Sequence, residues 1–325
     1  MESTSVVVIG GGTGTFPVIS ALKQQPINLT SIIAVSDSGG STGRIRDEFG
    51  FQPVGDLRQA LAALAQDDGE EWIRKILLYR FEKGNGLKGH NLGNLILTAL
   101  QDMTGDTTQA LEIAEKVFRL NGEVVPATAD NVQLEITYGD GTVVVGEHTL
   151  DDNATEAKPI KHVRLIPQAK ISAKAAEAIR DAKLIVIGPG DYYASLMAAL
   201  LPEGVKEAFA QSSAKVVYMV NLMTRLTQTN GMSARQHVSG IEAAIGKTLD
   251  YVVTNNGVIP QEILDIYAAS HEFPVKDDLG TGKNIIRVDV VSNELSKKLA
   301  VDTAHRSLLR HDVNKVGQVL NKLLQ

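Results

Sequence analysis

The sequence contains no cysteine and only one tryptophan among its 325 residues. The lack of cysteine excludes disulfide bridges, thiolate zinc sites and thiol nucleophiles. It is also compatible with a reducing compartment, and we expect a cytoplasmic protein.

Long apolar runs are missing as well. No run approaches the roughly 20 residues that a membrane-spanning helix needs. The first residues lack the charged and apolar regions that are typical of a signal peptide. We therefore expect no insertion into a membrane.

Basic residues are neither numerous nor clustered. Lys and Arg total 32 against 38 Asp and Glu, which gives a formal net charge of −6 at pH 7. No long Lys/Arg block occurs, so binding to nucleic-acid phosphates is not expected.

The common catalytic signatures are absent too. Neither an HExxH zinc pattern nor a G-x-S-x-G elbow occurs, and the seven histidines show no metal-ligand spacing. The stretch 280–283 looks like the end of a Walker loop, but Asp277 stands where its first glycine is required. The sequence therefore identifies no catalytic residue and no metal ligand.

What the chain does have is an α/β rhythm. Apolar strand-like runs such as 6–9, 31–35 and 183–187 alternate with helical patterns. Within 125–168 the character changes to alternating apolar and polar residues with a Gly-Asp-Gly turn, which indicates a hairpin with one wet face. The length also fits two modest domains, but we predict a single α/β domain over 1–325 with a small β-rich insertion at about 125–168.

Three glycine-rich loops follow predicted strands. The first, Gly10–Thr15, meets the dinucleotide pattern G-x-G-x-x-G at Gly10 and Gly12, while Thr15 takes its last position. Glycines let a backbone approach a ligand closely, and the following helix start offers N–H groups to an anion. A tight turn without ligand is the alternative.

The second and third loops strengthen the ligand-site interpretation. The third, 188–195, begins with Gly188-Pro189-Gly190 directly after the apolar run 183–187. The second, 36–44, carries the hydroxyls of Ser38, Ser41 and Thr42 and the phosphate-suited fork of Arg44. In consecutive βα units, such loops emerge at one carboxyl edge of a parallel sheet. A flexible surface loop is the alternative for the second loop.

Two further segments have a ligand-binding and a structural interpretation of similar weight. His90 and Asn91 stand beside glycines at a predicted helix start, where they could bind a ligand or cap the helix. Asp56 precedes a helix-forming run, where we expect a cap of that helix at least as much as a catalytic role.

Five motifs in one order resemble the bacterial gluconeogenesis factor family, the YvcK-like proteins, over essentially the whole chain down to Arg310-His311-Asp312. They are Gly10-Gly11-Gly12-Thr13-Gly14, Asp37-Ser38-Gly39-Gly40-Ser41-Thr42-Gly43, Gly55-Asp56-Leu57-Arg58, Gly89-His90-Asn91-Leu92-Gly93-Asn94 and Gly188-Pro189-Gly190. This family is related in fold to 2-phospho-lactate transferase, an enzyme of deazaflavin-coenzyme synthesis.

The resemblance implies a Rossmann-like three-layer α/β/α fold with a mostly parallel sheet. It also implies a cytoplasmic protein that binds a nucleotide sugar of the UDP-N-acetylglucosamine type and links carbon supply to cell-wall synthesis and cell shape. The nucleotide-binding candidates are Gly11, Gly12, Thr13, Gly14, Asp37, Ser38, Gly39, Gly40, Ser41, Thr42, Arg44, His90, Asn91, Gly188, Pro189, Gly190, Asn221 and Arg310.

Three functions follow from these patterns. The first is a regulatory UDP-sugar-binding protein with a possible partner in cell-wall synthesis and a possible homo-oligomer. The second is a Mg²⁺-dependent transferase using a nucleotide diphosphate-linked donor, although Asp37 is the only carboxylate of the second loop. The third is an NAD(P)-dependent oxidoreductase, which only the first loop and Asp37 favour.

Overall fold

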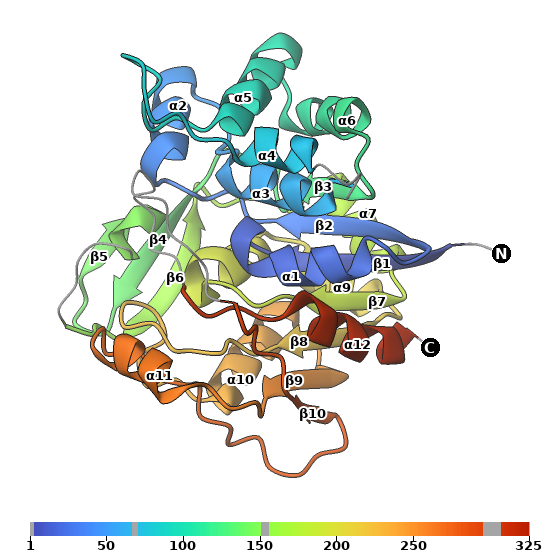
Figure 1. The fold of residues 1–325 in the computed structure, drawn as a ribbon, viewed down its shortest axis with the longest axis vertical. Helices are drawn as coiled ribbons and strands as arrows, with labels where there is room; N and C mark the ends of the chain where they lie inside the picture. Colours follow the sequence, from blue (N-terminus) through green and yellow to red (C-terminus); the bar gives the residue numbers. More distant parts are fainter. Residues whose placement is uncertain (1–2, 67–70, 151–155, 295–306, 325) are drawn as a thin grey trace.

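The main sheet has seven parallel strands in the order β10-β9-β8-β7-β1-β2-β3. The computed structural model describes residues 3–66, 71–150, 156–294 and 307–324 (Figure 1). The strands are β1 (Thr4–Gly10), β2 (Ile27–Ile33), β3 (Glu123–Pro126), β7 (Leu184–Ile187), β8 (Lys215–Met219), β9 (Tyr251–Asn255) and β10 (Ile285–Val288).

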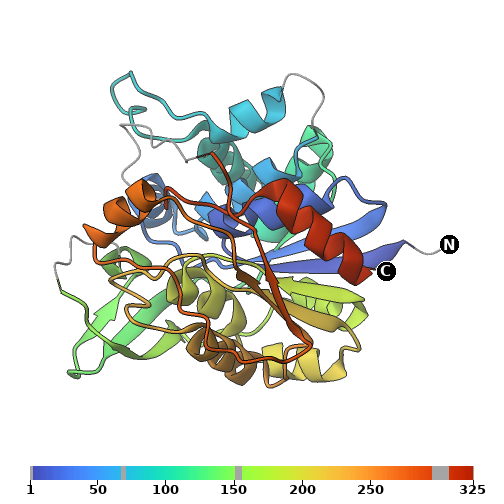
Figure 2. The same cartoon turned by 60° about the horizontal axis from the view of Figure 1, so that its bottom comes forward.

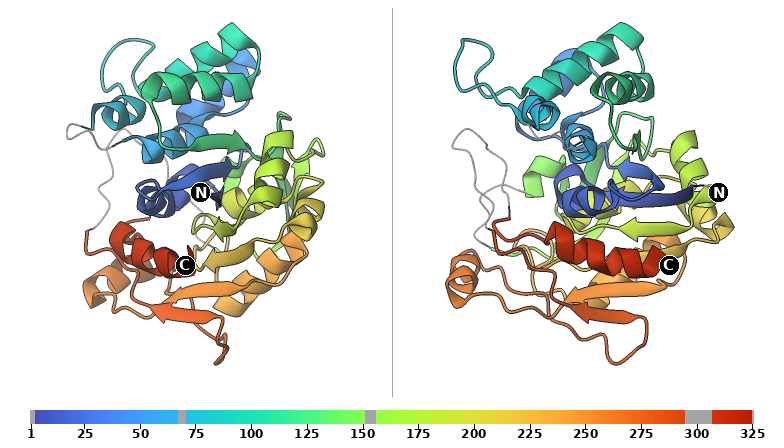
Figure 3. Two further views of the ribbon diagram at one scale, coloured as in Figure 1. Left: turned by 90° about the vertical axis from the view of Figure 1, so that its right-hand side faces the viewer. Right: turned by 45° about the vertical axis from the view of Figure 1, so that its right-hand side comes forward.

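Helices cover both faces of this sheet (Figure 3). On one face α1 packs between α12 and α3. On the other face lie α7, α9 and α10. This confirms the three-layer α/β/α prediction. The helices named here are α1 (Gly12–Leu22), α3 (Gly55–Leu64), α7 (Ala173–Asp181), α9 (Val205–Gln211), α10 (Ala234–Ile245) and α12 (Val313–Leu324).

The apolar runs of the sequence become the inner strands because helices cover them on both sides. Val6, Val7, Val8 and Ile9 of β1 are at most 1% exposed. All four residues of β7 are buried too. These runs therefore lack the alternation of a half-exposed strand, as the sequence predicted.

The remaining helices extend the layers or lie at the ends of the molecule. They are α2 (Gly40–Phe49), α4 (Trp72–Leu78), α5 (Leu92–Thr104), α6 (Thr107–Phe118), α8 (Ala198–Leu200), α11 (Gln261–Ala268), a 3₁₀ turn (Glu147–Leu150) and a π-helix (Tyr192–Met197).

The predicted hairpin is present as a small antiparallel sheet in the order β5-β4-β6, with β4 (Gln133–Tyr138), β5 (Val143–Val145) and β6 (Ile160–Ile166). Residues 125 and 126 of the expected insertion belong instead to β3 of the main sheet. The small sheet lies with α2 and α11 at the end of the molecule toward which β1 runs (Figures 1 and 2). These three elements flank the carboxyl edge of the main sheet.

The strand order reverses between β1 and β7. From β1 the chain adds β2 and β3 on one side, and β7 to β10 on the other. In open α/β sheets, ligands bind outside the carboxyl ends of the strands at such a switch point. The fold therefore directs attention to the loops that follow β1 and β7.

Candidate functional site

The first and third glycine loops touch each other at this switch point. A Cβ atom at Gly14 would lie 2.2 Å from the carbonyl oxygen of Pro189 and 2.4 Å from the Cα atom of Gly190. Only a residue without a side chain allows the two loops to approach this closely. The loops after β1 and β7 thus pack directly against each other, backbone to backbone.

The second loop joins them through the start of α3. A Cβ atom at Gly55 would lie 2.5 Å from Thr42 Oγ1 and 2.6 Å from Asp37 Oδ2. The next residue, Asp56, lies beside the first loop, because a Cβ atom at Gly11 would be 2.8 Å from its Oδ2 atom. All three loops therefore gather at one edge.

The glycines of the first loop are packed against protein. A Cβ atom at Gly12 would lie 2.2 Å from the carbonyl oxygen of Asp56 and 2.5 Å from the Cβ atom of Gln59. With Gly11 and Gly14, this makes three glycines that α1 needs in order to reach α3 and the third loop. Close packing thus accounts for much of the glycine cluster that the sequence attributed to a ligand.

The second loop continues directly into a helix. Residues 40–44 form the first turn of α2 instead of a flexible loop. Gly39 is the N-cap of this helix and has no side chain that could accept an N–H. Asp37 Oδ1 accepts the N–H of Gly39 at 2.8 Å, and the Thr42 hydroxyl donates to the same carboxylate. The side chains of Ser41 and Arg44 lie outside the described part of the structure.

Three half-buried carboxylates face this edge, Asp37, Asp56 and Asp191. Burial and the neighbouring charges of Asp37 and Asp191 raise the pKa of Asp56 to about 7, against a hydrogen bond from the Gly12 N–H and the charge of Arg58. Burial also raises the pKa of Asp37. Of these three carboxylates, the sequence indicated only Asp37 as a nucleotide-binding candidate.

The expectation that Asp56 caps its helix was wrong. Val54 holds the N-cap position of α3, and Asp56 lies in the first turn. Its carboxylate instead accepts the N–H of Gly12, the first residue of α1. Asp56 therefore connects two helix starts, which local sequence cannot reveal.

A buried arginine supports the acidic groups. Arg58 is 5% exposed, and its Nε atom donates to Asn94 Oδ1 at 2.7 Å. Asn94 Nδ2 donates to Thr42 Oγ1 at 3.3 Å, which links Arg58 to the second loop. Arg58 belongs to the motif Gly55-Asp56-Leu57-Arg58, but the sequence did not show that its charge acts on both Asp37 and Asp56.

His90 and Asn91 have structural contacts here. Asn91 is 1% exposed and caps α5, where its Oδ1 atom accepts the N–H of Asn94 at 3.1 Å. The backbone of His90 pairs with Phe81 and Leu87. Asn91 thus has the capping role that the sequence left open, and it orients the asparagine that holds Arg58.

The third loop is held by Asn221. The amide of Asn221 donates to the Gly190 carbonyl at 2.8 Å and accepts the Gly190 N–H at 3.4 Å. The next residue, Asp191, pairs with Arg225 at 2.8 Å. Asn221 lies among the predicted site residues, but its amide is engaged with the loop backbone.

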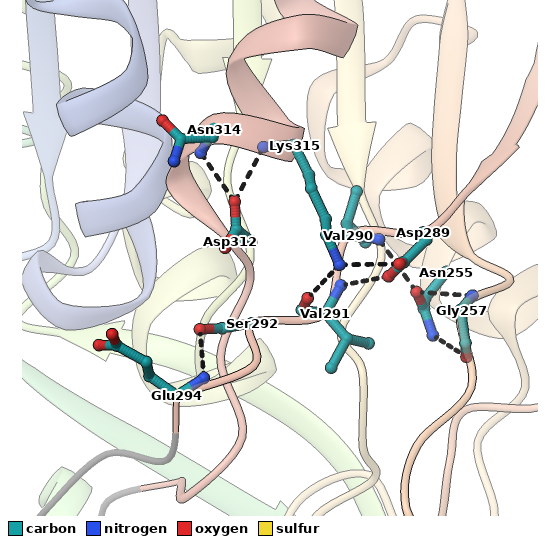
Figure 4. Close-up of polar contacts among 10 residues, drawn as sticks. All are labelled: Asn255, Gly257, Asp289, Val290, Val291, Ser292, Glu294, Asp312, Asn314 and Lys315. Carbon is teal, nitrogen blue, oxygen red and sulfur yellow. Dashed lines mark hydrogen bonds and ion pairs between the residues drawn. The ribbon is translucent and has the colours of Figure 1, made fainter.

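Arg310 lies on the segment that leads into α12. Its carbonyl accepts the Ser292 N–H at 2.9 Å, and Asp312 caps α12 through the N–H groups of Asn314 and Lys315. Figure 4 shows this cap beside the Lys315 contacts that hold Asp289 and the Val291 carbonyl.

His311 fixes the same segment to the main sheet. Its buried side chain hydrogen-bonds the backbone of Val220, the neighbour of Asn221, and burial lowers its pKa to about 4. The chain after residue 306 thus returns to the third-loop side of the site.

No group of three or more acidic or histidine side chains could hold a metal ion within the described residues. Mg²⁺ often takes only one or two protein carboxylates together with phosphate oxygens of a substrate. In the described parts of the chain, none of the helices is long and apolar enough to cross a membrane.

Known proteins resemble the chain over almost its full length. The family model of 2-phospho-L-lactate transferase CofD matches residues 6–296. The gluconeogenesis factor of Bacillus subtilis (strain 168) is 36% identical over 100% of this chain and 99% of its own length. The gluconeogenesis factor of Halalkalibacterium halodurans is 35% identical, with 98% and 96% covered.

A solved structure agrees with these matches. The crystal structure of a UPF0052 family member from Bacillus halodurans superposes with a TM-score of 0.87 at 35% identity and covers 99% of both chains. Sequence motifs, strand order and these relatives lead to one conclusion. The chain belongs to the gluconeogenesis factor family and is built on a CofD-type domain.

Proposed function

We propose that the protein is a regulatory protein that binds a nucleotide diphosphate-linked sugar of the UDP-N-acetylglucosamine type at the carboxyl edge between β1 and β7. The observation that carries this proposal is the direct contact of Gly14 with Pro189 and Gly190 at the switch point. A surface of backbone at that point suits a diphosphate.

The start of α2 is the best place for phosphate oxygens. Its N-cap, Gly39, has no capping side chain, and the nearest atom to an added Cβ there is Asp37 Oδ1 at 3.5 Å. The α1 start is less available, because Asp56 accepts the N–H of Gly12. In this proposal Arg58 supplies positive charge from below, and Asp37 accepts hydrogen bonds from ribose or sugar hydroxyls.

The biological role follows from the family. Relatives at 35% and 36% identity are called gluconeogenesis factors, which supports a role in carbon metabolism during gluconeogenic growth. A nucleotide sugar is a precursor class for cell-wall polymers. The bound sugar would therefore report carbon supply to a protein partner in cell-wall synthesis, with effects on cell shape.

A Mg²⁺-dependent transferase is the second candidate. The match to the CofD model favours it, as do Asp56 and the two carboxylates whose charges act on it, Asp37 and Asp191. Mg²⁺ would neutralise the diphosphate leaving group, held by Asp37 and Asp191 together with phosphate oxygens. The residues of the chain would orient the donor across the glycine loops.

Calorimetry with UDP-N-acetylglucosamine, UDP, uridine and NADH tests the proposal directly. We expect UDP-N-acetylglucosamine and UDP to bind. Uridine, which lacks the diphosphate, and NADH, which lacks the uridine, should bind much more weakly. NADH binding without UDP-sugar binding would instead support the oxidoreductase. Incubation with UDP-N-acetylglucosamine and Mg²⁺, followed by product analysis, separates the sensor from the transferase, because turnover excludes a purely regulatory role.

A further inference from the structure

One segment of the chain, Asn221–Gln228, holds the third glycine loop and the start of the π-helix. The side-chain amide of Asn221 hydrogen-bonds both the N–H and the carbonyl of Gly190, and Arg225 Nη1 donates to Asp191 Oδ1 at 2.8 Å. These contacts fix two consecutive loop residues from the same side.

The far end of this segment fixes the π-helix. Gln228 is 5% exposed, and its Oε1 atom accepts the N–H groups of Tyr193 at 3.2 Å and Ala194 at 3.3 Å. These N–H groups lie in the first turn, where no helical carbonyl can serve them. The segment therefore sets the backbone from Gly190 to Ala194.

The segment is itself anchored. Thr224 and Phe273 exchange two hydrogen bonds, at 2.7 Å and 2.9 Å, and Val275 donates to the Leu222 carbonyl at 3.1 Å. Arg225 is thus attached to a backbone that is hydrogen-bonded through its near neighbours Thr224 and Leu222.

The charges around Arg225 show what its guanidinium does. Its side chain is 13% exposed and pairs with Asp191. The guanidinium also lies near the carboxyl group of Glu272, a residue that is 7% exposed. One cation therefore lies between two carboxyl groups, and Asp191 in turn lies close enough to Asp56 to raise its pKa.

We infer that Arg225 is a positioning residue for an anionic diphosphate, which it admits to the third loop by neutralising Asp191. This inference rests on the proposed function. Without the guanidinium, the carboxylate of Asp191 would repel the ligand, because an unpaired charge in a partly buried site interacts strongly with other charges. Uridine carries no such charge and would not sense the change.

The test is calorimetry with UDP and with its uncharged counterpart uridine, in buffer with a chelator. Arg225→Gln is expected to weaken UDP binding roughly tenfold and to leave uridine binding unchanged, as expected for loss of one partner of a charge pair. Adding Asp191→Asn to Arg225→Gln removes the carboxylate that has lost its ion-pair partner. The double variant should therefore regain UDP affinity to within about threefold of wild type. Thermal unfolding of each variant reports whether it is folded.

Each outcome decides something. If the wild-type protein binds neither UDP nor UDP-N-acetylglucosamine, the proposed function fails, and this inference fails with it. If the wild type binds UDP and Arg225→Gln binds it equally well, only the inference is overturned. An equal loss for UDP and uridine that Asp191→Asn does not restore would show that Arg225 only supports the loop.

A second variant covers the case in which Arg225→Gln does not fold. Arg225→Lys keeps the positive charge while it loses the guanidinium geometry. We expect UDP affinity within about threefold of wild type for this variant. A loss beyond roughly tenfold in folded Arg225→Lys would overturn the electrostatic role.

Discussion

The first and second glycine loops look alike in sequence and are used differently in the fold. In the first, added Cβ atoms at Gly11, Gly12 and Gly14 would each meet protein atoms closer than 3.0 Å. In the second, an added Cβ at Gly43 would lie 2.3 Å from the Ser38 carbonyl oxygen of the same loop, but one at Gly39 meets nothing closer than 3.5 Å. Glycine clusters after strands can therefore mark either tight contact between segments or an open backbone, and only tertiary structure distinguishes them.

The sharpest way to break this comparison is Gly14→Ala. The new methyl group would lie 2.2 Å from a backbone carbonyl that cannot move without shifting the third loop. We expect the free energy of unfolding to fall by about 3 kcal/mol or more, as for overpacked sites. Urea denaturation measures this free energy. Gly50→Ala would not serve as a control, because the φ of +73° at Gly50 would add backbone strain. A loss below about 1 kcal/mol would show that the two loops separate easily.

Asp56→Asn tests the carboxylate that connects α3 to the first loop. Because the pKa of Asp56 is raised from 3.8 to about 7, folding favours its protonated form, so stability is lost as pH rises from about 4 to 7 and the loss is complete above pH 7. The variant should therefore be more stable than wild type by about 1–2 kcal/mol at pH 8. The difference should shrink as pH falls from 7 to 4.

Unfolding curves at several pH values, with exposed Asp181→Asn as the control for loss of one charge, measure this effect. A difference between wild type and Asp56→Asn that does not change with pH would contradict the raised pKa.

Thr42→Val removes the hydroxyl that joins the second loop to its support. The hydroxyl donates to Asp37 and accepts from Asn94, and the residue is 6% exposed. Loss of these bonds at nearly constant volume should lower the free energy of unfolding by about 1 kcal/mol. Denaturant titration measures it. Thr98→Val, which removes a hydroxyl bonded to the Asn94 carbonyl within α5, is the matched control and should cost less.

Gly39→Ala should have the smallest effect on stability and a clear effect on binding. Its φ of −91° suits any residue and its surroundings are open, so the free energy of unfolding should change by less than about 1 kcal/mol. The methyl group would stand before the first N–H groups of α2, and UDP affinity should fall roughly tenfold. Unchanged affinity in calorimetry would remove α2 from the phosphate site.

The fold could be predicted because its signals are local. Continuous apolar runs indicated covered strands, and residues of the capping type stand at the observed helix starts, namely Ser172, Asp312 and the capping box of Ser233 and Gln236. Each of these features depends on residues within four positions of one another. The alternating residues of β4 likewise revealed one wet face.

The site was harder because its contacts join distant residues. Asp56 looked like a cap, but its partner Gly12 lies on another helix. Arg58 acts through Asn94, which is 36 residues away. The π-helix has no sequence signature of its own and follows from the Gln228 contact with its first turn. Such pairings depend on tertiary packing, and no periodicity or spacing encodes them.

The packing of α12 on α1 joins the last helix to the first. A Cβ atom at Gly317 would lie 3.5 Å from the Cβ atom of Ala21, which is ordinary contact. While the chain is being synthesised, the amino-terminal βα unit therefore leaves the ribosome with one flank uncovered. It gains that cover only after α12 emerges, so a nascent chain that is cut before α12 would expose the flank of the helix into which the first glycine loop leads.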